Sequence, residues 1–204
     1  MKLLSTTTRQ LHREKGQFWT PEWVADAMIS YVLPETRLVL DPATGNGAFL
    51  KALQKMDKDN KIKFYGIDND QTVLNEKIYS NSKCQVENID FLEKKFDMKF
   101  DAIIANPPYI RHHKLSVATK KMLKKMALHI VGDNIDGRAG YHVYFLIKAL
   151  SILNKNGRLS FIVPADTVEG VFSKKLWKWI IKNYCLDAVI TFSQKASPFP
   201  SVDT

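Results

Sequence analysis

The 204-residue sequence predicts an α/β fold with a mainly parallel sheet covered by helices on both faces. Strand-like runs rich in Val, Ile and Phe alternate with longer helical segments, and no internal repeat interrupts this alternation. Helical segments connect the successive strands, as parallel pairing requires. Polar residues also follow several strand ends, and parallel sheets bind their ligands at that edge.

The first predicted helix covers residues 20–33, "TPEWVADAMISYVL". Thr20 is a candidate cap, and Pro21 suits the first helical position because its missing N–H has no partner there anyway. Apolar residues recur at helical spacing, at Val24, Ala27, Met28 and Tyr31.

The remaining elements form a series of strand and helix units. Strands are predicted at 37–43, 62–68, 84–90, 100–106, 158–164 and 186–192. Further helices are predicted after the glycines near residue 46, at 70–80, at 139–157 and at 173–183.

The composition predicts one packed globular body, since 45% of the residues are hydrophobic. No apolar run has the length of a signal peptide or a membrane span, which predicts a soluble protein of the cytoplasm. Cys84 and Cys185 lie far apart in the sequence and are expected to be reduced. The net charge of +9 favours a polyanionic partner, although a lysine-rich proteome explains it equally well.

A glycine-containing turn after the first strand indicates a ligand site. In "DPATGNG", Gly45 and Gly47 allow a ligand to approach the backbone, but two glycines alone are a weak signal. The stretch lacks the third glycine of dinucleotide sites and the Gly-Lys-Ser/Thr of phosphate loops. Asp68 ends the second strand about 20 residues further on, where a carboxylate accepts hydrogen bonds from ribose hydroxyls. A nucleoside ligand is therefore predicted.

Three motifs together resemble a known family, the S-adenosyl-L-methionine-dependent N6-adenine DNA methyltransferases of the gamma motif order, in their restriction-modification branch. "GQFWTP" at 16–21 resembles the N-terminal cofactor motif, "DPATGNGAFL" at 41–50 the glycine motif, and "NPPY" at 106–109 the catalytic motif. The resemblance implies a Rossmann-like methyltransferase sheet, with an N-terminal arm and helix at 1–36 and a catalytic domain at 37–204. It also implies S-adenosyl-L-methionine as cofactor and double-stranded DNA as partner.

The resemblance also implies roles for individual residues. Thr20 and Pro21 match positions that contact the methionine part of the cofactor, and Asp90 matches the position that binds its adenine. Phe91 is either a face for that adenine or a core residue. The full set of implied cofactor residues is Thr20, Pro21, Asp41, Ala43, Gly45, Gly47, Asp68, Asp90, Phe91 and Phe145.

The motif "NPPY" suits methylation of an exocyclic amine. Asn106 and a main-chain carbonyl of Pro107 or Pro108 would accept the two N6–H groups, which favours the positive charge that develops on nitrogen. The prolines end the strand because they cannot donate to the sheet ladder. Tyr109 would stack on a base rotated out of the duplex, a contact worth about 1–3 kcal/mol.

A basic insert follows the motif at 111–138 and has a net charge of +5. A helix beginning near Ser116 places lysines on one side and Met122, Leu123, Met126 and Ile130 on the other. His112 and His113 lack further ligands at metal spacing, so no metal site is predicted. The side chains expected to follow DNA phosphates are Arg111, Lys114, Lys120, Lys121, Lys124 and Lys125.

Two alternatives to DNA methylation remain. Release-factor glutamine methyltransferases carry the same tetrapeptide, and an inactive module would keep the fold without the chemistry. Compared with the family, the sequence is expected to lack a final antiparallel strand and a target recognition domain, as in a truncated catalytic domain.

Overall fold

The structure is a computed structural model that describes residues 18–72, 74, 78–79, 82–170 and 173–192. The chain forms two compact units, each described by itself. The unit containing the sheet comprises residues 19–107 and 148–162, and we call it the sheet unit. The other described residues, which are 18, 108–147 and 163–192 without 171–172, form the helical unit.

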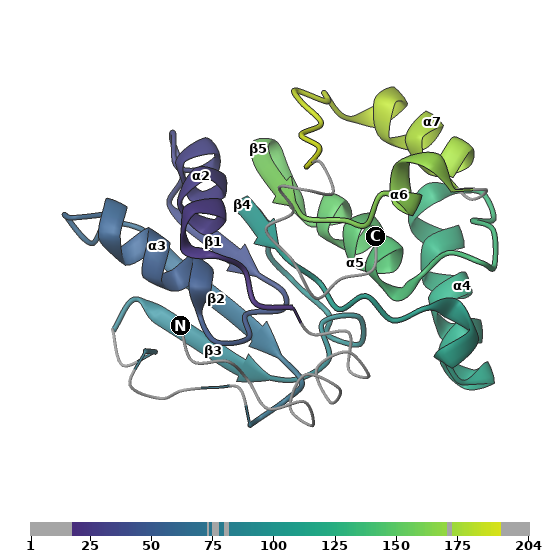
Figure 1. Ribbon diagram of the computed structural model, residues 1–204, viewed down its shortest axis with the longest axis horizontal. Coiled ribbons are helices and arrows are strands. Elements are labelled where there is room, and N and C mark those ends of the chain that lie inside the picture. Colours follow the sequence, from purple (N-terminus) through teal and green to yellow (C-terminus); the bar gives the residue numbers. More distant parts are fainter. Residues whose placement is uncertain (1–17, 73, 75–77, 80–81, 171–172, 193–204) are drawn as a thin grey trace. The chain divides into compact units, whose positions relative to one another are not determined.

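The elements occur in the predicted α/β alternation (Figure 1). The strands are β1 (Leu38–Asp41), β2 (Lys63–Asp68), β3 (Cys84–Asn88), β4 (Phe100–Ala105) and β5 (Leu153–Phe161). The helices are α2 (Glu22–Val32), α3 (Ala48–Met56), η1 (His112–Lys114), α4 (Val117–Val131), α5 (Tyr141–Ser151), α6 (Asp166–Glu169) and α7 (Ser173–Asn183).

The sheet has the strand order β3-β2-β1-β4-β5, and every pair in it is parallel. The chain builds outward from β1 to β3 and then returns to β4 on the other side of β1. The order therefore reverses between β1 and β4, and ligands bind in such sheets beyond the carboxyl ends of these two strands. Asp41 is the last residue of β1 and Asn106 follows β4 directly.

Helices α2 and α3 cover one face of the sheet (Figure 1). Ile29 of α2 and Phe49 of α3 pack with Val39 of β1 and Ile104 of β4, and all four are almost fully buried. Tyr65, Phe91, Phe96 and Phe100 form a cluster of aromatic rings whose centroids lie 5.5–6.4 Å apart. Burial of each such side chain stabilises the fold by about 1.5–3 kcal/mol.

The first helix was predicted correctly in place, but its predicted cap was wrong. The buried residues are Val24, Ala25, Ile29 and Val32, whereas Ala27 and Tyr31 are exposed. Pro21 rather than Thr20 occupies the N-cap position, and no side chain caps this helix.

The predicted strand at 186–192 is not formed. These residues have no regular structure, and Val189 and Ile190 are 52% and 79% exposed. A strand needs a partner for its backbone groups as well as an apolar pattern, and no described strand pairs with this segment.

Of the helix predicted at 70–80, residues 71–72 and 78–79 form turns, and 73, 75–77 and 80 lie outside the described residues.

The predicted helix at 139–157 ends earlier, at Ser151. Strand β5 then begins at Leu153 rather than at residue 158, and its register against β4 shifts between Phe100 and Ala102. Asn156 has a φ of 66° beside Gly157, a left-handed conformation that a helix cannot continue through.

In the helical unit, α4 begins where the insert helix was predicted. The Ser116 side chain accepts a hydrogen bond from the Thr119 N–H at 3.0 Å and caps the helix. Leu123 and Ala127 are buried, whereas Lys121, Lys124 and Lys125 are exposed. The amphipathic pattern of the insert therefore describes the real helix.

Candidate functional site

The polar ends of the strands lie at the carboxyl edge of the sheet, as predicted. Asp41 and Asp68 are the last residues of β1 and β2, and Asn106 follows β4. Asp90 lies two residues beyond β3. Because the strands are parallel and adjacent, these side chains collect at one edge of the sheet unit.

The glycine turn between β1 and α3 is held to the end of β2. The Gly45 N–H donates to Asp68 Oδ2 at 2.8 Å, and the Thr44 N–H donates to the Ile67 carbonyl at 2.9 Å. Gly45 and Gly47 have φ values of 51° and 74°, which residues with a Cβ rarely adopt. A Cβ on Gly45 would also lie 3.0 Å from the Trp19 ring. The turn thus requires glycine for its conformation and for its close contact with the N-terminal motif.

Tyr79 supports the same turn from the far side. Its hydroxyl donates to the Gly45 carbonyl at 3.1 Å and lies 3.3 Å from Thr44 Oγ1. Burial raises the pKa of Tyr79 to about 12, so this hydroxyl keeps its proton at physiological pH. The turn is consequently held in one shape by hydrogen bonds from two directions.

Asp41 is a buried carboxylate at the centre of this edge. Its Oδ1 accepts a hydrogen bond from the Ala43 N–H at 3.1 Å, whereas Oδ2 is buried without a hydrogen-bond partner among the described residues. Burial raises the pKa of Asp41 to about 8; the Ala43 N–H and the Thr44 side chain oppose this rise, and the nearby Asp68 carboxylate adds to it. An unpartnered buried carboxylate oxygen suits a cationic ligand, such as the amino or sulfonium group of S-adenosyl-L-methionine.

Asn106 contacts the N-terminal cofactor motif. Its Nδ2 donates to the Thr20 hydroxyl oxygen at 3.1 Å, which joins two motifs that are 86 residues apart in the sequence. This bond fixes the orientation of the side-chain amide: Nδ2 points toward Thr20, and Oδ1 points to the opposite side. Thr20 therefore orients Asn106 instead of capping α2.

The turn after β3 carries Asp90 and Phe91. Asp90 Oδ1 accepts a hydrogen bond from the Leu92 N–H at 2.8 Å. The Phe91 ring is 1% exposed and packs on Phe96, so it has no exposed face for adenine. Phe91 thus occupies a core position, and Asp90 is the polar side chain of this turn.

Lys148 on α5 holds this turn in place. Its ammonium donates to the carbonyl oxygens of Phe91, Leu92 and Lys94 at 2.6, 3.0 and 2.6 Å. Burial lowers the pKa of Lys148 to about 8, while the neighbouring Asp90 opposes this effect. The buried ammonium group of Lys148 thus binds three carbonyl oxygens of the same turn.

We expect Lys148→Met to weaken S-adenosyl-L-methionine binding by about tenfold or more. Methionine keeps the apolar stem but leaves three buried carbonyl groups without a donor, at about 1–3 kcal/mol each when unsatisfied. Isothermal titration calorimetry measures the affinity. The control is Lys94→Met, which removes a lysine that pairs with Glu87 in the same region. Equal affinities for both folded variants would show that Lys148 does not position this turn.

In the helical unit, Tyr109 lies among aromatic side chains. Its ring stacks on Phe18 with centroids 5.6 Å apart and planes inclined by 26°, and the His142 ring lies perpendicular to it at 5.8 Å. His142 Nε2 shares a hydrogen bond of 2.9 Å with Thr167 Oγ1. Burial lowers the pKa of His142 to about 4, so this imidazole is neutral at physiological pH. A neutral imidazole therefore supports the Tyr109 ring.

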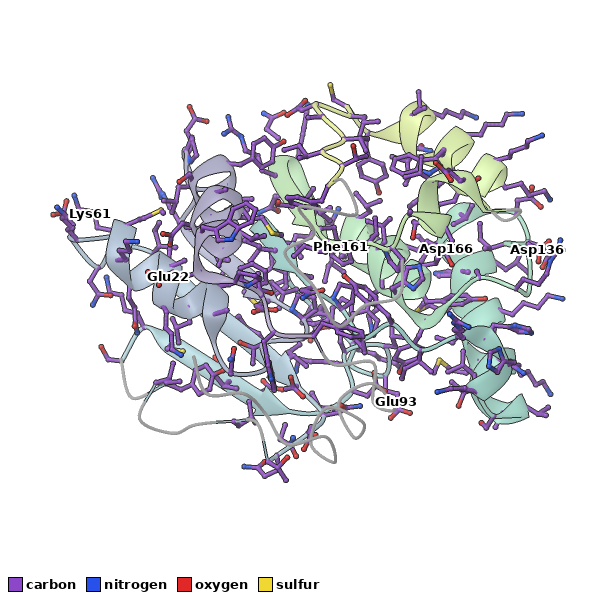
Figure 2. All side chains as sticks on the ribbon, viewed as in Figure 1. Glu22, Lys61, Glu93, Asp136, Phe161 and Asp166 are labelled. Atoms are coloured by element: carbon purple, nitrogen blue, oxygen red, sulfur yellow. The ribbon has the colours of Figure 1, made fainter. Side chains whose placement is uncertain are left out.

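The remaining predicted residues are placed as follows. Phe145 is buried on α5 against Tyr141, with ring centroids 5.4 Å apart, which is a core position. Pro107 is buried, and Pro108 is half-buried. Arg111 and Lys114 are exposed at either end of η1, and the carboxyl of Asp166, labelled in Figure 2, lies within the electrostatic influence of Arg111.

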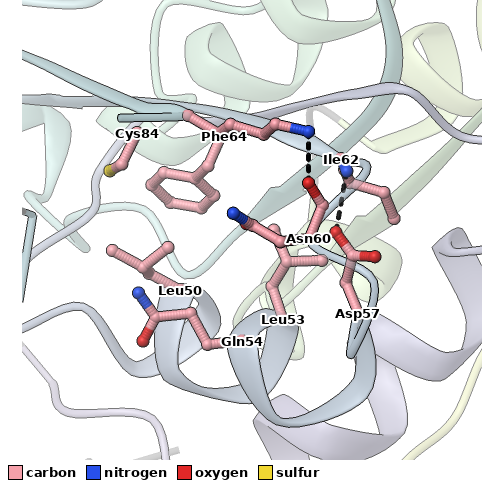
Figure 3. Close-up of a pocket in the computed structure, with 9 residues that line it drawn as sticks. Leu50, Leu53, Gln54, Asp57, Asn60, Ile62, Phe64 and Cys84 are labelled. Atoms are coloured by element: carbon pink, nitrogen blue, oxygen red, sulfur yellow. Dashed lines mark hydrogen bonds between the residues drawn. The ribbon is translucent and has the colours of Figure 1, made fainter. Parts of the chain in front are cut away.

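A pocket in the sheet unit lies away from the carboxyl edge. It is lined by Leu50 and Leu53 of α3 and by Phe64 and Cys84 near the amino ends of β2 and β3 (Figure 3). The Asp57 carboxylate there accepts hydrogen bonds from two backbone N–H groups of the following turn, which is a structural role. This pocket is therefore separate from the candidate site.

Membrane-spanning helices and metal sites are two further features to consider in the described residues. None of the described helices is long and apolar enough to cross a membrane. No group of three or more His, Cys, Asp or Glu side chains in the described part of the chain has the arrangement of a metal site.

Sequence reasoning missed four residues that build the site: Trp19, Tyr79, His142 and Lys148. Lys148 alone had a usable signal, since it is the one charged residue in the apolar run "YFLIKAL" of α5. A lysine inside an otherwise buried helix needs acceptors. Nothing in the sequence indicates which acceptors those are.

The sheet order and the polar site at its switch point define a Rossmann-like α/β fold. The fold is also found in the methyltransferase subunit of a type I restriction-modification system from Streptococcus thermophilus, with a TM-score of 0.63, 20% identity, and coverage of 81% of this chain and 38% of that one. A class I S-adenosylmethionine-dependent methyltransferase from Listeria monocytogenes gives a TM-score of 0.64 at 19% identity, over 83% and 53% of the two chains.

Residues 11–199 match the model of the Eco57I restriction-modification methylase family. The chain is 30% identical to the type II methyltransferase M.AccI of Acinetobacter calcoaceticus, over 92% of this chain and 35% of that protein. It is also 30% identical to the type II methyltransferase M.HincII of Haemophilus influenzae, over 88% and 34% of the two chains. The chain belongs to the Eco57I restriction-modification methylase family, which confirms the branch predicted from the motifs.

The chain spans about a third of the length of these two relatives. A release factor glutamine methyltransferase from Clostridium acetobutylicum is 27% identical, over 78% of this chain and 59% of that protein. The predicted cofactor, S-adenosyl-L-methionine, is the one named for the Listeria protein of the same fold.

Proposed function

We propose that this chain transfers a methyl group from S-adenosyl-L-methionine to N6 of an adenine rotated out of DNA, as part of a restriction-modification system. The hydrogen bond between Asn106 and Thr20 carries this proposal. It connects the catalytic motif to the cofactor motif at the carboxyl end of β4, beside the strand that bears the glycine turn.

The residues of the carboxyl edge divide into two groups by function. Asp41, Asp68 and the glycine turn bind the cofactor, which supplies an electrophilic methyl group when bound. Asn106 Oδ1 accepts one N6–H of the substrate, and the Pro107 or Pro108 carbonyl accepts the other. These acceptors hold the nitrogen lone pair toward the methyl carbon and favour the positive charge that forms on nitrogen.

The methyl transfer balances in electrons and protons without a further reactant. The N6 lone pair forms the new N–C bond, the electron pair of the breaking C–S bond stays on sulfur, and N6 then loses one proton to water. The acceptors on Asn106 and proline carry no charge, so the reaction is aided by placement and dipoles rather than by a strong base.

Tyr109 provides the stacking surface for the base. Its raised pKa, caused by burial, keeps the ring a neutral phenol. Phe18 now stacks on this ring, so a base that stacks on the same face takes the place of Phe18. Support from His142 keeps the Tyr109 ring oriented during that exchange.

A methyl-transfer assay tests the proposal. The protein is incubated with tritiated S-adenosyl-L-methionine and unmethylated genomic DNA, and digested nucleosides are analysed by chromatography. We expect label in N6-methyladenine. Label in cytosine, or no label in DNA above that of a reaction without enzyme, would contradict the proposal.

Methylation of a protein glutamine is the competing function, because the same acceptors would hold a side-chain amide. A protein substrate gives no reason for the lysine-rich face of α4, whose Lys121, Lys124 and Lys125 are exposed. Release factor as acceptor in the same assay separates the two. Transfer to release factor without transfer to DNA would favour the protein substrate.

A further inference from the structure

Basic charge is concentrated in one of the two units. The described residues of the sheet unit contain thirteen Lys and Arg and thirteen Asp and Glu, so this unit is neutral. The described residues of the helical unit contain eleven Lys and Arg against five Asp and Glu. A lysine-rich proteome would enrich both units alike. The segregation therefore indicates that the helical unit binds a polyanion.

Helix α7 contributes a basic face that sequence analysis left without a role. Lys174, Lys178 and Lys182 follow one another at intervals of four residues and are all exposed. They lie opposite Leu176 and Ile180, which are buried. Nitrogen-tipped side chains project outward from α7 in Figure 2. With a rise of 1.5 Å per residue, the three lysines span about 12 Å of the helix.

These three lysines are not held in ion pairs within the described part of the chain, although the charge of Lys178 helps to lower the pKa of Asp133. Lys175, the fourth lysine of α7, pairs with Asp133 at 3.0 Å and so links α7 to the segment after α4. None of the other three lies within salt-bridge distance of an acidic side chain in the described part of the chain. The helix itself contains no acidic residue. The face therefore remains open to an external anion.

The helix is attached to the support of Tyr109. Trp177 Nε1 donates to the Thr167 carbonyl at 2.8 Å, and Thr167 Oγ1 is the partner of His142, whose ring contacts Tyr109. An anion held on the outer face of α7 is thus placed relative to the catalytic tyrosine through a short series of buried contacts.

We propose that the outer face of α7 binds the phosphate backbone of the DNA substrate through Lys174, Lys178 and Lys182, as a second phosphate-binding helix beside α4. This inference rests on the proposed function. DNA is favoured as the occupant because its phosphates form a continuous row of negative charge, about one for each 1.7 Å of helix axis, which a 12 Å row of lysines can follow.

The salt dependence of DNA binding tests the proposal. The triple variant K174Q/K178Q/K182Q is compared with wild type and with the control K58Q/K95Q/K99Q, which removes three exposed lysines from the neutral unit. Affinity for a double-stranded oligonucleotide is measured by fluorescence anisotropy at several salt concentrations. We expect the slope of log K against log salt to decrease in magnitude by about two to three in the α7 variant, since each phosphate contact contributes about 0.9.

The control should keep the wild-type slope, and both variants should keep the wild-type circular dichroism spectrum. An unchanged slope in the α7 variant, with a steep slope in wild type, would overturn the α7 inference and leave DNA methylation standing. Wild type without salt-dependent DNA binding would overturn both. Preferential binding to vesicles of phosphatidylserine and phosphatidylcholine, lost in the α7 variant, would assign this face to a membrane surface and also overturn the inference.

Discussion

Replacing Asn106 by alanine should lower the rate of methyl transfer to DNA by about 10²–10³-fold, because one of the two acceptors for the reacting amine is removed. The dissociation constant for S-adenosyl-L-methionine should change by less than about threefold. The hydrogen bond from Asn106 Nδ2 to Thr20 links Asn106 to the cofactor motif, and Thr20 keeps its own place before α2 in the variant. Single-turnover transfer and calorimetric binding give the two quantities separately.

The matched control for Asn106→Ala is Asn154→Ala in the same unit. Asn154 Nδ2 donates to Asp101 Oδ1 at 2.7 Å, so the control also removes a side-chain amide with a structural hydrogen bond. It should retain transfer close to the wild-type rate. If the Asn106 variant methylates DNA as fast as the Asn154 variant, Asn106 is not the acceptor of the reacting amine.

The sheet could be predicted because its information is local. Strands β1, β2 and β4 are short, largely apolar runs that end at or beside a polar residue, and each of the first four described strands ends within two residues of a predicted functional position. The segment at 186–192 has the same apolar alternation and is exposed, since a strand also depends on a partner that a local pattern does not specify.

The site was predictable only in part, because most of its described hydrogen bonds join residues far apart in the sequence. The motifs identify Asn106 and Thr20 separately, whereas their hydrogen bond depends on how the chain folds. Lys148 binds carbonyl groups more than 50 residues earlier in the chain, and any residue type can provide a carbonyl. The sequence left Phe91 open between a core position and a ligand contact, and only the fold shows that its ring is buried in the core.

The affinity for S-adenosyl-L-methionine should increase as the pH rises from 6 to 7.5, by up to about tenfold per pH unit. Burial raises the pKa of Asp41 to about 8, so this carboxyl is protonated in the free protein at neutral pH. A cationic ligand favours the ionised carboxylate, and binding therefore releases a proton. Below pH 8 each decrease in proton concentration favours the complex.

The same shift has a consequence for the protein without ligand. Because the pKa of Asp41 in the folded state exceeds the unfolded value of 3.8, the proton binds more tightly to the folded chain. The stability from this group is complete below the unfolded pKa and is lost as the pH rises through about 8. Thermal unfolding of the free protein should therefore move to lower temperature across this range, and less so when the cofactor is bound.

The variant Asp41→Asn distinguishes titration of the Asp41 carboxyl from titration of any other group nearby. The amide keeps an oxygen for the Ala43 N–H but cannot ionise, so its cofactor affinity should be independent of pH between 6 and 7.5. Calorimetry in buffers of different ionisation enthalpy should find close to one proton released by wild type at pH 6 and close to none by the variant. Asp97→Asn, at an exposed position of the same unit, should release protons as wild type does.

Lys148, with its pKa lowered to about 8, begins to titrate only at the upper end of this range, and the described residues of the sheet unit contain no histidine. Wild-type affinity that does not depend on pH would therefore mean that Asp41 does not face a cationic part of the cofactor.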